Sequence, residues 1–272
     1  MKKNNFKTLL GIFTVLIAMI WVFPIFWIFI NSFRSGQAII AKEITLFFKP
    51  TLEHYLLVFT KYPFIRYLIN STIVVIFTTA ISVWAGSLAA YSLARFNTGG
   101  MNYALWILSS RMLPPAVLVI PFYIIFRNLG IINTWYVLII AYTTFNLSFV
   151  VLVMKGYFEE VPVEIEEAAL IDGASRMSTF YHISVPLARP GIIACSVFCA
   201  IFSWNEFLFA LVLSVSKNSK TLPVAAGDFV TAYAINWGPL FAAGVIILIP
   251  VIIFTLIVQK HISRGLTLGA LK

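Results

Sequence analysis

Side chains that commonly carry catalysis or bind metals are few and scattered in this sequence. Cys195 and Cys199 are the only cysteines, and no histidine or further cysteine lies near them to complete a metal-binding set. His54, His182 and His261 fall in separate segments, and the sequence has no His-Glu-x-x-His motif, no Gly-x-Ser-x-Gly elbow and no Walker-type phosphate loop. We therefore expect no catalytic or metal site in this chain, and we interpret the cysteines as helix packing residues.

Two ionisable residues, Arg111 and Glu206, fall inside long apolar runs. A charge at the centre of a bilayer costs about 2.5 kcal/mol or more, so each is a candidate functional residue. Glu206 and its neighbours Trp204 and Asn205 fit two hypotheses: they line a translocation path, or they join two helices by hydrogen bonds. Arg111 is interpreted as structural. A direct ion pair with Glu206 requires a shifted or kinked helix, and Pro114 and Pro115 could provide a kink.

Aromatic side chains provide further candidates for a translocation path. Tyr142, Trp204, Tyr233 and Trp237 could stack on sugar rings, whose C–H faces suit aromatic surfaces. Tryptophan and tyrosine also gather at membrane–water interfaces, and this anchoring role is the favoured alternative for any single one of them.

The most informative soluble segment comprises residues 155–189. Pro162 suits the first position of a helix, and the acidic residues that follow it suit the positive end of the helix dipole. Gly173 suits a left-handed stop at the C-terminal end. A short helix from about Val163 to Asp172 is therefore predicted.

One face of this predicted helix combines small, apolar and acidic side chains. At 100° per residue this face holds Ile165, Ala168, Ala169 and Asp172, with Glu167 on its flank. Two alanines on one face allow another backbone to approach closely, which suits docking to a partner.

A second short helix is predicted directly after the first. Ser175 can cap it, and it reaches Tyr181 or His182 before Pro186 and Pro190 end it. Two such helices lying across the end of a membrane bundle can be held by a partner protein. The alternative is an ordinary amphipathic connector that rests on lipid headgroups.

The elements that position these residues are predicted to be membrane-spanning helices. Of the 272 residues, 61% are hydrophobic and 11% are charged, which is more apolar than soluble domains. A spanning helix needs about 17–25 apolar residues, because the hydrocarbon core is about 30 Å thick. We predict an all-α membrane protein with about six transmembrane helices: Leu9–Ile30, Tyr67–Leu93, Tyr103–Phe126, Trp135–Met154, Pro190–Leu213 and Phe241–Val258.

The remaining organisation follows from charge and from helix-breaking residues. Proline and glycine interrupt Thr221–Leu240, which indicates a partly re-entrant or surface segment. The net charge of +9 is spread over termini and loops, so we expect no nucleic-acid partner. The basic N-terminus favours two cytoplasmic termini. We divide the sequence into residues 1–66, a first helix with an external loop, and residues 67–272, a core with the cytoplasmic loop 155–189.

The run Glu167-Ala168-Ala169-x-x-x-Gly173, with Asp172 before the glycine and Ile183 and Pro186 after it, resembles a known family motif. It is similar to the "EAA" loop of permease subunits of binding-protein-dependent ABC importers, and it lies between the expected fourth and fifth spans. Other motifs resemble the carbohydrate branch, in particular the smaller permease of maltose-type systems: Arg111-Met112-x-Pro114, Asn133-Thr134, Trp204-Asn205-Glu206, Thr221-Leu222-Pro223 and Gly265-Leu266-Thr267-x-Gly269-Ala270-x-Lys272.

The resemblance implies a type I ABC importer transmembrane domain, which is a transport subunit and not an enzyme. In the family, the loop helix inserts into a cleft of a cytoplasmic ATPase subunit. The residues implied to couple this chain to ATP hydrolysis are Glu167, Ala168, Ala169, Asp172 and Gly173.

The resemblance also implies partners and a location. They are a second, different permease chain, two cytoplasmic ATPase subunits that use ATP and Mg, an external solute-binding protein, and the lipid of a bacterial or archaeal cell membrane. The expected solute is a sugar or oligosaccharide. The alternatives are a different solute or a self-contained secondary transporter, although the chain is short for a secondary transporter and shows no internal repeat.

Overall fold

The structure, a computed structural model, describes the backbone of residues 2–41, 47–96 and 98–269. Within these residues the secondary structure is helical, apart from an isolated bridge between Val230 and Ile235. The predicted all-α class is therefore confirmed. The chain forms two compact units, of which the first comprises Met1–Ile65 and Ala225–Ile249 and the second Arg66–Val224 and Pro250–Lys272.

Four of the described helices are long and apolar enough to cross a membrane. They contain the expected first, second, fourth and sixth spans, and they are α1 (Lys2–Ser32), α4 (Phe64–Phe96), α7 (Trp135–Glu159) and α14 (Trp237–Gly269). A fifth span results if the segments Arg176–Leu187 and Arg189–Asn205, bent by 79° at their junction, are counted together. The chain is thus a multi-pass membrane protein.

The expected third span is divided into two helices, which corrects the prediction of one continuous helix. They are α5 (Gly100–Met112) and α6 (Pro115–Asn128). Between them Leu113 and Pro114 are extended, with ψ values of 125° and 130°. A residue before proline avoids the helical region, and two prolines in succession extend this effect over both linking residues.

The expected fifth span, Pro190–Leu213, is also interrupted. It consists of α11 (Arg189–Asn205) and α12 (Leu208–Leu213), with Glu206 extended between them at φ −67° and ψ 126°. The Glu206 carboxylate accepts hydrogen bonds from the backbone N–H groups of Phe209 (3.0 Å) and Ala210 (3.2 Å). These bonds satisfy the exposed donors at the start of α12, which stabilises the break.

In the first unit, α1, α2 (Gly36–Ile40), α3 (Glu53–Lys61) and the start of α14 pack through short polar contacts. The Ser32 and Tyr55 hydroxyls lie 2.7 Å apart. His54 lies so close to Gly238 that a Cβ there would come within 2.1 Å of the ring. Part of Thr221–Leu240 belongs to this unit, and the segment contains the short helix α13 (Leu222–Gly227), a turn and the first residues of α14. Pro223 and Pro239 lie in the first turns of these two helices.

In the second unit the core forms two clusters, one at each end of α7. One cluster joins α7 to α6 and α12 around Leu138 and Phe209, and the other joins α7 to α4 and α11 around Met154 and Phe158. At Gly86 a Cβ would lie 2.7 Å from the Val150 side chain, so the glycine is what allows α4 and α7 to approach this closely.

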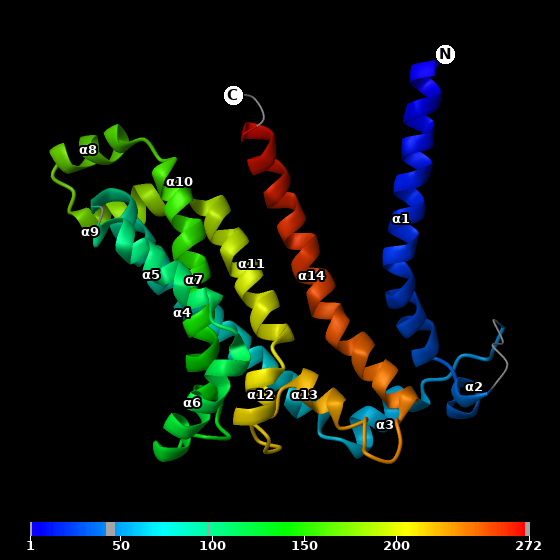
Figure 1. Ribbon diagram of the computed structural model, residues 1–272. Helices are drawn as coiled ribbons and strands as arrows, with labels where there is room; N and C mark the ends of the chain where they lie inside the picture. Colours follow the sequence, from blue (N-terminus) through cyan, green and yellow to red (C-terminus); the bar gives the residue numbers. More distant parts are fainter. Residues whose placement is uncertain (1, 42–46, 97, 270–272) are drawn as a thin grey trace. The chain divides into compact units, whose positions relative to one another are not determined.

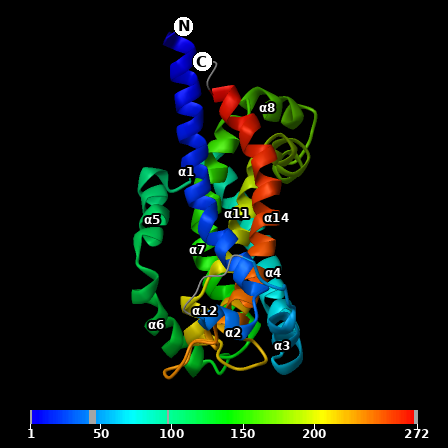
Figure 2. The same ribbon diagram turned by 90° about the vertical axis from the view of Figure 1, so that its right-hand side faces the viewer.

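The short helices of the second unit lie at opposite ends of its bundle. The helices α8 (Val163–Ile171) and α9 (Arg176–Thr179) lie at one end of α7 and α11, whereas α6 and α12 lie at the other end (Figures 1 and 2). The segment between α7 and α11 is therefore presented at an end of the bundle and not inside it.

Candidate functional site

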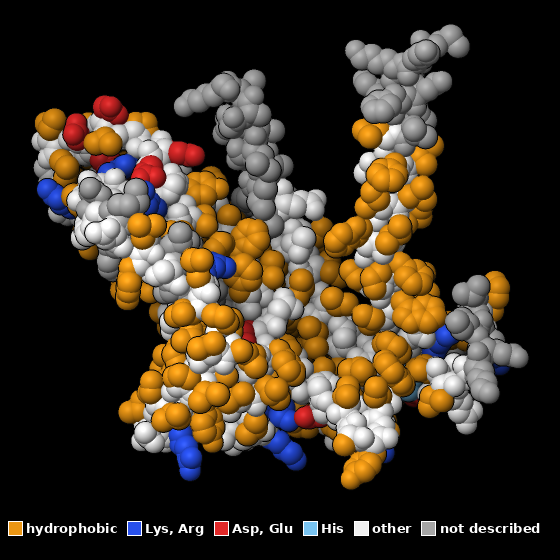
Figure 3. All heavy atoms as spheres, viewed as in Figure 1, with side chains coloured by type: hydrophobic (Ala, Val, Ile, Leu, Met, Phe, Trp, Pro, Cys, Tyr) orange, Lys and Arg blue, Asp and Glu red, His pale blue; other side chains and the backbone are white. Residues whose placement is uncertain are grey.

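The predicted loop helix is present as α8, which begins directly after Pro162. Among its nine residues Glu166 alone is buried. Ile165 is 44% exposed, and Ile171 is 86% exposed. Acidic side chains gather on the surface over this helix (Figure 3). Both apolar and acidic side chains of this loop are therefore exposed on the surface.

The candidate coupling residues lie on this open surface. Glu167, Ala168, Asp172 and Gly173 are exposed, and Ala169 is half-buried. The structure therefore brings all five residues together on one helix and the turn that follows it.

A Schellman motif ends α8, which confirms the predicted glycine stop. The Ala174 N–H donates to the Ala169 carbonyl at 3.0 Å, and the Gly173 N–H donates to the Leu170 carbonyl at 3.1 Å. Gly173 has a φ of +86°, a conformation that glycine adopts without the steric cost of a Cβ atom. The residue type at this position is therefore set by backbone geometry.

The second arm of the loop differs from the prediction in its length. Ser175 caps α9 as expected, because its hydroxyl accepts a hydrogen bond of 3.2 Å from the Ser178 N–H. The chain then continues helically through a π-helix, η1 (Phe180–Ser184), and α10 (Val185–Leu187). Contrary to the prediction, Pro186 does not end the helix. It lies directly after the π-helix η1, where the regular α-helical hydrogen-bond pattern is already interrupted.

From the sequence, Glu166 is predicted only as a favourable charge at the start of the helix. In the structure it also forms a buried ion pair. Its carboxylate forms a bidentate ion pair with Arg95, with both Nε···Oε2 and Nη2···Oε1 at 2.9 Å. Burial raises the pKa of this carboxyl, but hydrogen bonds from Arg95, Ser184 and Tyr91 and the Arg95 charge outweigh it and hold the pKa below its ordinary value. The sequence gives no sign of this pairing, because 71 residues separate the partners.

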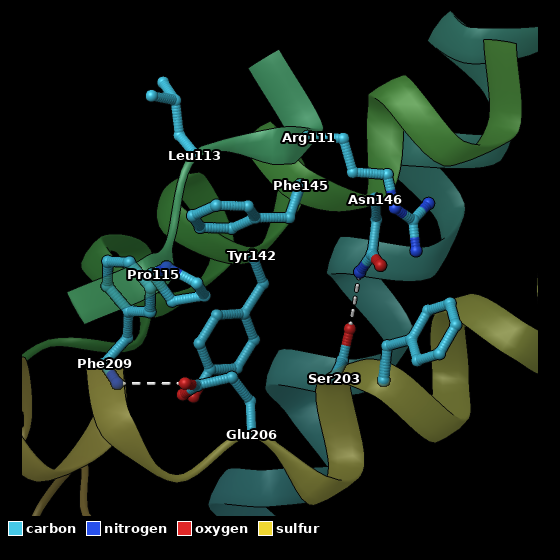
Figure 4. A pocket seen from close by; sticks show the side chains of 10 residues that line it. Arg111, Leu113, Pro115, Tyr142, Phe145, Asn146, Ser203, Glu206 and Phe209 are labelled. Carbon is cyan, nitrogen blue, oxygen red and sulfur yellow. Dashed lines mark hydrogen bonds between the residues drawn. The ribbon is translucent and has the colours of Figure 1, made fainter. Parts of the chain in front are cut away.

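A second candidate site is a cavity of about 250 Å³ near the breaks in the two interrupted spans (Figure 4). Polar and aromatic side chains from α5, α7 and α11 share its wall. It is lined by Arg111, Leu113, Pro115, Tyr142, Phe145, Asn146, Phe202, Ser203, Glu206 and Phe209.

Five residues are the main candidates for the translocation path: Tyr142, Trp204, Asn205, Glu206 and Tyr233. Two of them meet in this cavity. The buried Tyr142 side chain points toward the Glu206 carboxylate, whose oxygens cap α12 (Figure 4). Asn146 donates a hydrogen bond of 2.8 Å to Ser203 in the same wall. The cavity thus offers a carboxylate, hydroxyls, an amide and aromatic faces, a mixture that suits a polar organic solute.

Arg111 also lines the cavity and lies over aromatic rings. Its guanidinium carbon is 4.8 Å from the centroid of Phe149 and 5.5 Å from that of Phe202. In the part of the chain that the structure describes, no ion pair joins it to Glu206. Cation–π contact therefore offsets part of the cost of placing this charge beside the membrane core.

The other three candidate path residues lie elsewhere. Trp204 is buried within the helix packing and is absent from the cavity wall. Asn205 is exposed, and its amide donates to the Ile201 carbonyl. Tyr233 is 100% exposed in the turn of the first unit.

Sequence reasoning missed the polar pair in the cavity wall. Asn146 and Ser203 carry no charge, so they do not stand out in the sequence as Arg111 and Glu206 do. An amide in the middle of the apolar run Trp135–Met154 was the available signal.

Among the described residues, no group of three or more His, Cys, Asp or Glu side chains is placed to hold a metal ion.

These features define a class: a helical membrane protein with an uncovered loop helix between two apolar helices and a polar cavity within its bundle. Residues 82–268 match the family described as "Binding-protein-dependent transport system inner membrane component", and the chain belongs to this family. It is therefore a membrane-spanning permease subunit of an ATP-driven importer, a transport component and not an enzyme, which confirms the expectation from the EAA-type loop.

The similar proteins include carbohydrate permeases. The chain is 34% identical over 270 residues to the trehalose/maltose transport system permease protein MalG of Thermococcus litoralis, covering 98% of this chain and 97% of that protein. It is 34% identical over 256 residues to the sulfoquinovosyl glycerol transport system permease protein SmoH of Agrobacterium fabrum, covering 92% and 89%. These relatives confirm the resemblance to the carbohydrate branch.

The fold is also shared with a solved importer. A chain of the crystal structure of a bacterial ABC transporter involved in the import of the acidic polysaccharide alginate superposes with a TM-score of 0.81 at 24% identity, covering 95% of this chain and 97% of that chain. The expected fold, that of a type I ABC importer transmembrane domain, is confirmed.

Proposed function

We propose that this permease imports a sugar or oligosaccharide. The relatives named for sugar transport support this proposal, and so does the mixture of aromatic faces and polar groups in the cavity. Tyr142 and Glu206 are proposed to contact the solute there. Trp204, Asn205 and Tyr233 are proposed to act in the path at a different stage of transport, since they do not line the cavity.

We further propose that α8 is the docking element for a cytoplasmic ATPase subunit. The observation that carries this proposal is the open surface of α8, on which Glu167, Ala168 and Asp172 stand exposed beside Ile165. Small residues allow deep insertion into a cleft, and the carboxylates can pair with basic groups of the partner. Gly173 fixes the turn that presents this surface.

The proposed assembly contains this chain, a second permease of different sequence, two ATPase subunits that bind ATP and Mg, and an external solute-binding protein. It lies in the lipid of a bacterial or archaeal cell membrane, with both termini of this chain in the cytoplasm. In this arrangement residues 1–66 provide the first helix and an external loop, and residues 67–272 provide the core domain with the loop 155–189.

The experiment is transport by the purified assembly. The complex is isolated through a tag on this chain and reconstituted into proteoliposomes with ATP inside and radiolabelled trehalose or maltose outside, with and without the binding protein. We expect uptake that requires both ATP and the binding protein, and no ATP hydrolysis by this chain alone. Uptake that is independent of ATP would contradict the proposal, and binding of a non-carbohydrate solute by the external protein would contradict the assigned solute class.

A further inference from the structure

The loop helix α8 is attached to its bundle in an unusual way. Its single buried residue is the charged Glu166, whereas the apolar Val163, Ile165 and Ile171 are exposed. A surface helix ordinarily buries an apolar stripe against the core. The buried contact between α8 and the rest of its unit is therefore made by one carboxylate.

Each oxygen of that carboxylate accepts two hydrogen bonds. Oε1 accepts from Arg95 Nη2 at 2.9 Å and from the Ser184 hydroxyl at 2.8 Å. Oε2 accepts from Arg95 Nε at 2.9 Å and from the Tyr91 hydroxyl at 3.0 Å. Arg95 also donates to the Val161 carbonyl at 2.8 Å. The carboxylate is thus fully paired, and its plane is fixed by the guanidinium fork.

The donors come from elements that meet at this point. Tyr91 and Arg95 belong to the last turns of α4, a helix long enough to span the membrane, and Ser184 closes the π-helix η1. The rings of Phe158 and Phe180 pack around Tyr91, with centroids 5.5 Å and 5.0 Å from its own. The Arg95 and Glu166 side chains are only 8% and 6% exposed, so water competes little with their ion pair.

A contact of this kind has a mechanical consequence. Apolar surfaces can slide over one another because their attraction has no direction, whereas a bidentate ion pair holds both the position and the rotation of its partners. Movement imposed on α8 is then shared by α4 and is not absorbed at their contact.

We propose that the ion pair between Arg95 and Glu166 is the positioning contact that makes α8 and α4 move as one body during the transport cycle. This inference rests on the proposed docking of α8 to an ATPase subunit. Glu166 and Arg95 act through α8 and touch neither solute nor nucleotide.

The test measures the distance between α4 and α8 in the whole complex, reconstituted in nanodiscs. Spin labels are placed through Ile69→Cys on α4 and Ile171→Cys on α8, both exposed positions. The native Cys195 and Cys199 are buried. As a control, the chain without the two introduced cysteines is treated with the spin label, and no labelling is expected. Double electron–electron resonance is recorded without nucleotide and after trapping with ATP, Mg and vanadate.

With Glu166 present, we expect the distance to stay constant within about 2 Å on trapping, a shift no larger than ordinary interface adjustments. In Glu166→Gln we expect a change of about 5 Å or a broad distribution, because the neutral amide loses the ion pair. Glu164→Gln is the matched control, since Glu164 is an exposed carboxylate on the same helix, and it should behave as the parent. Equal distances in all three proteins would overturn the inference.

If the Glu166→Gln complex does not assemble, a second measurement on the isolated permease tests the inference. Hydrogen exchange of the α8 amides is then compared in the isolated permease, where we expect at least tenfold faster exchange in Glu166→Gln than in Glu164→Gln; equal rates would overturn the inference. Failure of the proposed function is recognised separately, because in that case a cross-linker on α8 does not reach an ATPase subunit even in the parent complex.

Discussion

Asn146 on α7 and Ser203 on α11 satisfy each other inside the bundle through an N–H···O hydrogen bond of 2.8 Å. Both side chains are buried, and both line the cavity beside Glu206. This pair therefore joins two apolar helices and also adds polar groups to the cavity wall.

Removing this pair should destabilise the helix packing by a modest amount. For Ser203→Ala we expect a loss of about 0.5–2 kcal/mol in unfolding free energy, since hydrogen bonds between membrane helices average about 0.6 kcal/mol. A double-mutant cycle with Asn146→Leu, measured by unfolding in detergent, isolates the coupling. The control is Ser196→Ala, which removes a bond within one helix. Zero coupling would show that the two side chains act independently.

The contact between Gly191 and Tyr157 predicts a steric effect. A Cβ at position 191 would lie 2.4 Å from the Tyr157 ring, so Gly191→Ala forces α11 away from α7. Overpacking of this kind costs about 1–3 kcal/mol. The variant should therefore have a lower Tm, and Tyr157→Ala in the same chain should recover part of the loss. An unchanged Tm in the single variant would refute the close approach.

Gly173 provides a prediction about backbone conformation. No atom lies within 4 Å of a Cβ built at this position, so Gly173→Val is disfavoured by its φ of +86° and not by lack of space. We expect strain of about 1–3 kcal/mol, reduced coupling of ATP hydrolysis to uptake, and normal membrane insertion. Gly173→Asn is the control, because asparagine tolerates the left-handed region. Equal loss in both variants would mean that the glycine serves a contact and not a turn.

The lowered pKa of Glu166 predicts a dependence of stability on pH. A carboxylate with a lowered pKa stabilises the fold at pH values above its ordinary pKa of 4.5, and this stabilisation is lost as pH falls below that value. The Tm in detergent should therefore stay level above about pH 5 and drop as the pH falls below about 4.5. Glu166→Gln should show a smaller drop than Glu164→Gln. Identical slopes would indicate that other groups control the acid transition.

Much of this architecture was predictable because membrane helices and caps depend on local sequence. The helix from Val163 and its stop at Gly173 follow from dipole, proline and glycine preferences alone. The interruption near Pro114 was expected only as a kink, and the chain breaks there because two prolines act in succession.

The contacts that hold the site could not be predicted in the same way. Glu166 and Glu167 are adjacent and chemically identical, yet the first is buried in an ion pair and the second is exposed. Only the position of Arg95 on α4 decides between them, and this depends on tertiary packing. For the same reason the cavity brings Tyr142 and Glu206 together but not Trp204.

The most direct test of the account is site-specific photocross-linking in the assembled transporter. A photoreactive phenylalanine is placed at Ile165 on α8 and, as a control, at Leu129 beyond the end of α6, which is also exposed. We predict a cross-link from position 165 to an ATPase subunit and none from position 129. A cross-link to an ATPase from position 129 only, or from position 165 to the external binding protein, would contradict the assignment of α8 as the docking element.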